Sequence, residues 1–322
     1  MKRKIVIALF VFLLFSAMTV KAEDSCGISS AVAKLYDAPQ KKLTPKKNFS
    51  GKKLKESRVH VGAAKSSELI YQYGQVFLSS APNHKRTFTQ TPVKNGDLIR
   101  TGDQSFAVIK TANGSHIKVL SNSHVYLRSI NRTPIHIELK HGRIDGSVES
   151  SPTPNKHTDS GNYKFLLTTP SLNMGVRGTQ FKVAHHVDDS QVSVNRGVVD
   201  VQPTNICGRV TELKANEGAS VTKTGLNKVK LLDSPDLSHV PNVFESTHAL
   251  IQFGSVLGVD HYRIRVAYDF EFIYLIKEQL SQQPEFKLEG LDNGYYYIKV
   301  TAVDHNGIEG IPSKIRILFQ YN

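Results

Sequence analysis

Residues 169–183 read TPSLNMGVRGTQFKV, and this stretch decides how the first half of the chain folds. An apolar run at residues 165–167 leads into it, and its last four residues alternate as in a strand. Two glycines, Gly175 and Gly178, flank Arg177. Glycines favour a backbone with positive φ or a close approach of two chain segments. The stretch therefore predicts two strands that meet at a tight corner, with one cation held between them.

The run T-P-x-x-x-x-G-V-R-G-T-x-F-x-V is similar to the signature of the FecR domain, a periplasmic all-β module. The matching residues are Thr169, Pro170, Gly175, Val176, Arg177, Gly178, Thr179 and Phe181. The resemblance extends over about residues 67–224 and implies a rolled, β-solenoid-like fold. The best-known members of the family are membrane-spanning transducers that regulate a sigma factor. A role in envelope signalling is therefore the function that the resemblance implies.

Arg177 has two interpretations. In the structural one it ties neighbouring strands together by donating to backbone carbonyls or to a carboxylate such as Asp97 or Asp200. In the functional one its guanidinium holds a carboxylate or phosphate of a partner in a bidentate contact. We favour the structural role, because an arginine buried between strands without a partner would be too costly.

Short strands dominate the chain from about residue 69 to residue 222. The runs are rich in Val, Ile and Phe and are mostly separated by Gly, Asn, Ser or Pro. A loose repeat places glycine corners between them, at residues 94–97, 140–143, 195–198 and 216–219. Strands that meet at such corners favour a rolled, solenoid-like sheet over a flat sandwich. The sequence therefore predicts an all-β fold, closed by residues 212–222 and followed by a hinge at 223–237.

The last segment, residues 233–320, has a pattern of its own. Its run L-x-x-G-x-Y-x-I-x-V-x-A-V-D begins at Leu291 and resembles the closing strands of a fibronectin type III domain. That resemblance places Tyr296 at a tyrosine corner and Phe253 where a core tryptophan is usual. We expect a small Ig/fibronectin type III-like β-sandwich, in which residues 270–280 form either a short helix or a strand.

Residues 1–22 have the order of a signal peptide. A positive start is followed by an apolar run at residues 5–20 and by Val20-Lys21-Ala22. We expect cleavage between Ala22 and Glu23, with the protein exported to the periplasm, secreted or held at the surface. The alternative is an uncleaved anchor, for which the apolar run is slightly short. No other run approaches a transmembrane length, so no membrane span is expected after cleavage.

The formal charge of +13 is concentrated near the N-terminus. Residues 1–22 carry +4, residues 23–66 carry +6, and only +3 remains from residue 67 onward. Residues 23–66 therefore read as a basic linker, with a docking segment for anionic envelope components as the alternative. Nucleic-acid binding is excluded as a prediction, because it needs cations clustered with aromatic residues on one structured surface.

Two cysteines remain after the expected cleavage, Cys26 and Cys207. In an oxidising compartment such a pair is a candidate disulfide. Since Cys26 lies only four residues into the mature chain, the pairing stays open.

The sequence contains no motif for a catalytic, cofactor or metal site. His185 and His186 are adjacent, so on a strand they would point to opposite faces and could not bind one metal together. Two functions remain. The first is a non-enzymatic envelope protein that binds a protein or a polysaccharide, with peptidoglycan as one candidate. The second is an exported enzyme acting on peptidoglycan or polysaccharide, which requires a cleft with paired carboxylates.

Overall fold

The computed structural model describes residues 28, 32, 66–80, 90–149 and 163–321. The elements in these ranges are strands, which confirms the all-β class. The first sixteen strands form one folded sheet, here the N-terminal unit. Their bounds are β1 Glu68–Tyr73, β2 Val76–Leu78, β3 Thr91–Pro92, β4 Asp97–Thr101, β5 Phe106–Lys110, β6 His116–Val119, β7 His124–Ser129, β8 Ile135–Ser147, β9 Phe165–Thr168, β10 Leu172–Val176, β11 Gln180–His186, β12 Asp189–Arg196, β13 Val198–Pro203, β14 Thr211–Lys214, β15 Glu217–Thr222 and β16 Gly225–Lys230.

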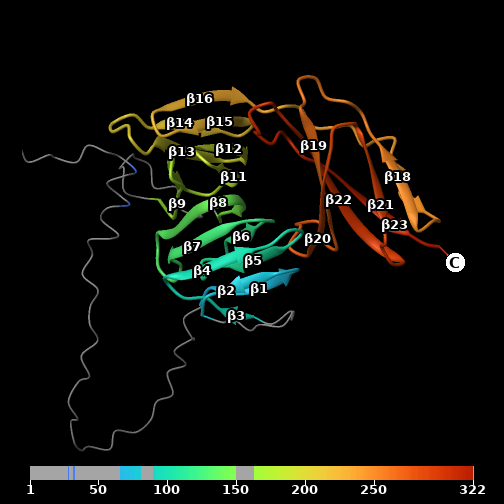
Figure 1. The fold of residues 1–322 in the computed structure, drawn as a ribbon, viewed down its shortest axis with the longest axis horizontal. Helices are drawn as coiled ribbons and strands as arrows, with labels where there is room; N and C mark the ends of the chain where they lie inside the picture. Colours follow the sequence, from blue (N-terminus) through green and yellow to red (C-terminus); the bar gives the residue numbers. More distant parts are fainter. Residues whose placement is uncertain (1–27, 29–31, 33–65, 81–89, 150–162, 322) are drawn as a thin grey trace, which may run out of the picture.

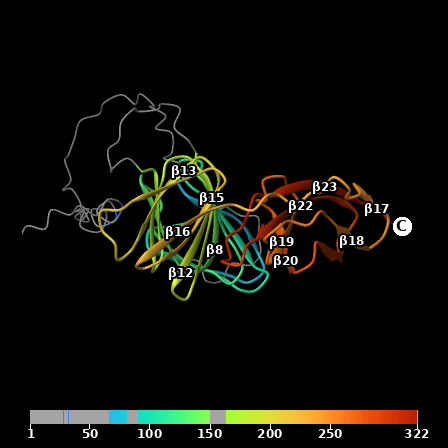
Figure 2. The same ribbon diagram turned by 90° about the horizontal axis from the view of Figure 1, so that it is seen from above.

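The sheet is rolled into two layers that share the long strand β8 (Figures 1 and 2). The first half of β8 pairs with β7 and, in parallel, with β9. Its second half pairs with β6 and β11. Layer A has the order β3-β1-β5-β6-β8-β11-β12-β15-β16, and layer B has the order β2-β4-β7-β8-β9-β10-β13-β14.

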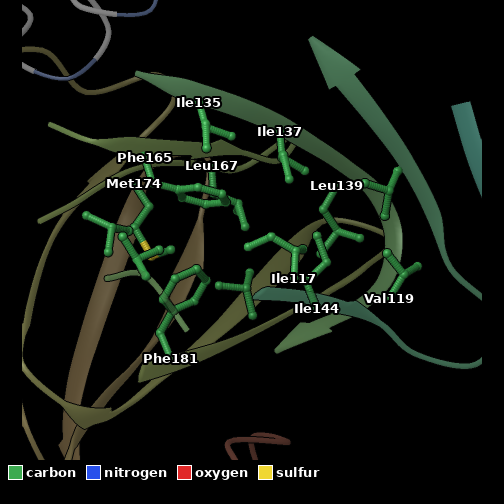
Figure 3. Close-up of a cluster of buried hydrophobic side chains, with 14 of the residues drawn as sticks. Ile117, Val119, Ile135, Ile137, Leu139, Ile144, Phe165, Leu167, Met174 and Phe181 are labelled. Atoms are coloured by element: carbon green, nitrogen blue, oxygen red, sulfur yellow. The ribbon is translucent and has the colours of Figure 1, made fainter. Parts of the chain in front are cut away.

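The main hydrophobic core lies between the two layers. Figure 3 shows side chains of β8, β9 and β10 in layer B pointing toward side chains of β6, β8 and β11 in layer A. These include Ile137, Phe165 and Met174 on one side and Ile117 and Phe181 on the other. Alternating apolar residues on each strand therefore face inward, as the short Val- and Ile-rich runs require.

The chain changes layer at residues with positive φ. Gly142 turns β8 from layer B into layer A with φ of +94°, and Gly197 turns the chain from β12 into β13 with φ of +86°. A glycine corner was expected at each of these two places, and both are confirmed. At residues 216–219 the corner is present, but the prediction that a glycine forms it was wrong. Asn216 adopts the left-handed conformation there, and Gly218 lies within β15.

The signature residues build one of these corners. Gly178, with φ of +137°, connects β10 in layer B to β11 in layer A. A Cβ at Gly175 would lie 2.4 Å from the ring of Tyr163, so the glycine makes room for that ring. Thr179 Oγ1 donates to the carbonyl of Val198 at 2.7 Å, which ties the corner to the next crossing.

The C-terminal unit is a second all-β body with its own core (Figure 1). A five-stranded sheet, β17-β23-β22-β19-β20, packs with a two-stranded sheet, β18-β21. Tyr296 donates its hydroxyl to the carbonyl of Asp292 at 3.0 Å, and Phe253 packs edge-on to Tyr262 in the core. The strand bounds are β17 Val243–Phe244, β18 His248–Gln252, β19 His261–Ala267, β20 Leu275–Ser281, β21 Glu285–Glu289, β22 Gly294–Val303 and β23 Ser313–Phe319.

One sequence-based boundary needs correction, and one open assignment proves to be a strand. The expected hinge at 223–237 contains strand β16, which pairs along its length with β15, so the first sheet continues to Lys230. A strand forms there because a two-residue turn after Thr222 lets the chain pair back on β15. The ambiguous segment 270–280 is a turn followed by β20, which pairs with β19.

Most of the N-terminal region lies outside the described residues, including the signal segment 1–22 and nearly all of the linker 23–66. Ile28 is an exception: it is fully buried against Tyr163 and Leu166, with Val32 beside it. The linker therefore has at least one contact with layer B. In the described part of the chain, no helix is long and apolar enough to cross a membrane.

We predict that Gly146→Ala destabilises the N-terminal unit. An added Cβ would lie 2.2 Å from the ring of Phe181, in the core between the layers. Such overpacking costs about 1–3 kcal/mol, and denaturant unfolding measures it. Gly225→Ala is the matched control, because its Cβ would meet Thr222 at an ordinary 3.4 Å. Equal stability of the two variants would contradict this packing of the core.

Candidate functional site

The signature region contains a buried polar cluster at one end of the rolled sheet. Ser190 Oγ lies 2.7 Å from Thr169 Oγ1, 2.9 Å from Ser171 Oγ and 3.0 Å from His185 Nδ1. Ser190 and Ser171 are fully buried. Although a serine bonded to a histidine resembles part of a catalytic triad, these hydroxyls bond to one another inside the protein. The cluster joins layer A to layer B.

Arg177 lies on the outer side of the corner. Its guanidinium donates to Asp200 at 2.6 Å and stacks over the ring of Tyr163, which also donates to Asp200 at 3.0 Å. Asp200 is one of the two carboxylates that the sequence suggested. The arginine is not buried, however, since its side chain is 54% exposed. Because an exposed ion pair contributes about 0–1 kcal/mol, the structure removes the burial on which the structural interpretation depended.

Cys207, in the loop after β13, is disulfide-bonded. Cys26, the partner that the sequence suggests, lies outside the described residues. His185 and His186 do point to opposite faces of β11, since the first is buried and the second is partly exposed. Over the described ranges, no group of three or more His, Cys, Asp or Glu side chains is placed to hold a metal ion.

The largest concentration of charge lies where the two units meet. On the outer face of layer A, Lys118, Asp145 and Lys182 are direct cross-strand neighbours on β6, β8 and β11. The C-terminal unit presents a second charged row across β20, β19, β22 and β23. Its members are Glu278, Arg265, Lys299 and Lys314, again direct neighbours.

Arg265 joins the two charged rows. It is 1% exposed, and its guanidinium donates to Glu278 at 2.6 Å and to Glu309 at 3.0 Å, both in its own unit. Its third partner is Asp145 of the N-terminal unit, at 3.2 Å. Lys182 of the N-terminal unit reaches back to Glu309 at 3.2 Å. We call these five residues, together with Arg263, the interface ion cluster; Arg263 lies 2.7 Å from Glu278 and 2.9 Å from Glu309.

Burial and the neighbouring cations act in opposite directions on the pKa values of the acidic groups in this cluster, and the cations prevail. Burial alone would raise the pKa of Glu309, but Arg265, Lys182 and Arg263 outweigh it and hold the pKa well below the usual range. The pKa of Glu278 is lowered in the same way, against its burial, by Arg265 and Arg263. Both carboxylates are therefore ionised at neutral pH and serve as fixed counter-charges.

Apolar and backbone contacts extend the interface beyond the ions. Phe106 and Leu120 of the N-terminal unit form one buried cluster with Phe272 and Leu275 of the C-terminal unit. The hydroxyl of Tyr71 donates to the carbonyl of Leu275 at 2.7 Å. The amide of Gln104 bonds both backbone groups of Glu278, at 2.8 and 3.1 Å, as a neighbouring strand would. The two units therefore pack together as one body, and the expected hinge does not hold them apart.

A groove of about 580 Å³ lies along this interface. Tyr73 and Gln104 of the N-terminal unit line it, and the C-terminal unit contributes part of β20, residues 289–292, Tyr268 and Tyr296. Tyr268 offers an exposed aromatic ring there, 55% accessible. Glu289, Asp292 and Gln279 supply polar groups. We take this interface groove as the candidate functional site.

The family comparison bears on the N-terminal unit. Residues 97–200 match the FecR protein family. The match covers the strands from β4 to the middle of β13 and includes every signature residue, within the longer span 67–224 that the sequence suggested. It leaves out the interface residues of the C-terminal unit.

Three solved structures resemble parts of the chain. A candidate anti-sigma factor from Parabacteroides distasonis is 17% identical with a TM-score of 0.34, covering 41% of this chain and 59% of that one. The chain thus spans about three-fifths of that protein. A Fn3-like protein from Clostridium thermocellum is 22% identical with a TM-score of 0.22, covering 27% and 91%. A β-1,2-glucanase from Parabacteroides distasonis is 13% identical with a TM-score of 0.24, covering 80% and 38%. No curated protein matches the chain.

Sequence reasoning missed the interface ion cluster and the interface groove. The signature residues that it singled out build a corner and an outer surface, and none of them lines the groove. The signal that was present is the run Arg263-Ile264-Arg265, whose alternation places two arginines on one face of a strand. The structure buries both arginines.

We predict that Arg265→Ala uncouples the two units. Removing one partner of a buried ion pair costs about 3–5 kcal/mol, because the remaining charges stay buried. The wild type should unfold in one calorimetric transition and the variant in two. Arg177→Ala, which removes an exposed arginine, is the control and should lose no more than about 1 kcal/mol. A single, unshifted transition in Arg265→Ala would contradict the role of the interface ion cluster.

Proposed function

We propose that the protein is a non-enzymatic component of the cell envelope that takes part in signalling by binding a polysaccharide or a protein. In this proposal the N-terminal unit is a FecR-type, solenoid-like rolled sheet and the C-terminal unit is fibronectin type III-like. The FecR family match supports the first assignment. The tyrosine-corner hydrogen bond of Tyr296 supports the second.

The binding proposal rests on the interface groove. Its volume of about 580 Å³ falls within the range of about 300–1,000 Å³ that is usual for ligand sites. A tyrosine ring can stack on the apolar face of a sugar, while its hydroxyl remains available for hydrogen bonds. Gln104, Gln279, Glu289 and Asp292 can bond sugar hydroxyls around the exposed ring of Tyr268. These groups favour a glycan, such as a peptidoglycan strand, over an apolar ligand.

A glycan-cleaving enzyme is the alternative, because carboxylates also line the groove. Most glycosidases need two carboxyl groups, one of which must be protonated to act as the acid. Glu278 does not suit that role: Arg263 and Arg265 hold its carboxylate, and its pKa is lowered despite burial. This observation removes Glu278 as a candidate for the catalytic acid.

Export to the periplasm through cleavage after Ala22 is part of the proposal. It is supported by the charged, apolar and small-residue order of residues 1–22. N-terminal sequencing of the protein from a periplasmic fraction should begin at Glu23. Recovery of Met1 from a membrane pellet would contradict export with cleavage.

We predict that purified peptidoglycan sediments with the wild-type protein and that Tyr268→Ala weakens this binding about tenfold. The loss corresponds to about 1.4 kcal/mol, which is reasonable for one aromatic ring in the groove. Tyr295→Ala is the matched control, since this tyrosine is 58% exposed but does not line the groove. Equal loss in both variants, or no sedimentation of the wild type, would contradict the proposal. Release of soluble sugar reducing ends by the wild type would favour the enzyme instead.

A further inference from the structure

A second, smaller cavity of about 90 Å³ lies at the same interface and shares no lining residue with the groove. Four lysines and two acids line it, which leaves two positive charges in excess. The lysines are Lys118, Lys182, Lys299 and Lys314, and the acids are Asp145 and Glu271. Since one water needs on the order of 10–15 Å³ of such space, the cavity has room for a small polyatomic ion.

Two of the lysines lie at adjacent positions, where their positive charges repel each other. Lys299 and Lys314 are direct cross-strand neighbours on β22 and β23, a position at which like charges destabilise a sheet. Lys118 and Lys314 donate to the backbone carbonyls of Glu271 and Phe270, so neither of these contacts supplies a counter-charge. Lys299 pairs with Asp145 at 3.5 Å, but that carboxylate is shared with Arg265. Its ammonium group also lies 4.7 Å from the centre of the Phe272 ring, which carries no net charge.

An unused donor also lies in the cavity wall. Among the described residues, Asn195 is one of four whose side chains hold a buried polar atom with no hydrogen-bond partner, here Nδ2. Asn195 belongs to β12 and lines this cavity. A buried amide nitrogen normally has an acceptor, because leaving it unpaired destabilises the folded protein. The donor and the excess ammonium groups have the same requirement, which is a negatively charged oxygen.

The ionisation of the lysines is consistent with that requirement. Burial, together with the charge of nearby Lys118 and Lys182, lowers the pKa of Lys299 well below the usual range. Burial also lowers the pKa of Lys118 and of Lys314. An anion between them would offset both the burial and the mutual repulsion.

We propose that this cavity is a binding site for a phosphate-class oxyanion. With all four lysines protonated, the excess of two positive charges matches a phosphate dianion, and a bound anion favours the protonated form that burial opposes. Lysine ammonium groups bind phosphate as point charges. Lys299 and Lys314 belong to the C-terminal unit, while Lys118 and Asn195 belong to the N-terminal unit, so the ion bridges the two. It would therefore stabilise the interface by binding only the packed state. This site does not depend on glycan binding in the groove.

Calorimetric titration of the full mature protein with inorganic phosphate tests the site. Sodium chloride keeps the ionic strength constant, so that general screening is the same in every titration. The wild type should bind one phosphate and should melt at a higher temperature in its presence. No measurable binding at millimolar phosphate would overturn the proposal.

Two variants and a control locate the site. Lys314→Ala should raise the phosphate dissociation constant at least tenfold, without lowering the melting temperature in phosphate-free buffer, because removing it relieves repulsion. Asn195→Ala should also weaken binding. Lys287→Ala removes an exposed lysine of β21 with the same change in net charge, and should bind like the wild type. An equal loss in Lys287→Ala and Lys314→Ala would mean that binding reflects net charge, which would also overturn the proposal.

A further titration identifies the source of the phosphate group. Glucose 6-phosphate presents the same group on a sugar. If it binds as inorganic phosphate does and is weakened by Lys314→Ala, the site accepts a phosphorylated glycan. If only the inorganic ion binds, the site takes free phosphate.

Discussion

Arg265 imposes the strongest constraint on this structure. A guanidinium that is almost completely removed from water needs counter-charges and hydrogen-bond acceptors, because an unpaired buried charge is among the most costly features a protein can contain. Glu278 and Glu309 come from its own unit, but Asp145 comes from β8 of the other. If the two units separated, Asp145 would be lost as a partner and the remaining charges would have to be rehydrated. The position of the C-terminal unit on layer A is thus dictated by charge pairing as much as by apolar contact.

Because of this constraint, the two units hold both proposed binding sites in a fixed shape. The interface groove and the lysine-lined cavity both have walls from the two units, so their shapes depend on the units remaining packed. A ligand in either site would be held by groups whose relative positions are already fixed, which reduces the ordering that binding requires. Conversely, any ligand that binds only the packed state stabilises the contact between the two units. Two units joined in this way can transmit a binding event at either site as a change in interface stability.

The sequence predicted the features that local patterns determine. The short alternating strands and the corners at Gly142 and Gly197 follow from residue type and spacing. Asp200 was one of two carboxylates suggested for Arg177, and the sequence did not choose between them. The interface does not follow from local patterns. Arg263 and Arg265 occupy alternate positions of a strand, a pattern that does not show whether their face is buried. The burial of Arg265 depends on Asp145, which is far away in the sequence. The small net charge after residue 66 gave no sign of the cluster, because its three acids cancel its three cations in the sum.

The signature itself encodes topology. Gly178 lets the chain leave layer B for layer A, Gly175 accommodates the ring of Tyr163, and Phe181 packs against Gly146 in the core. Each of these requirements is met inside the N-terminal unit, and the exposed guanidinium of Arg177 is already paired with Asp200. A motif whose residues are used in this way for folding leaves few groups to specify a ligand. Specificity must then come from surfaces outside the motif, as it does when one fold carries several functions. In this protein the surfaces with the required charges and aromatic groups are those at the contact between the two units.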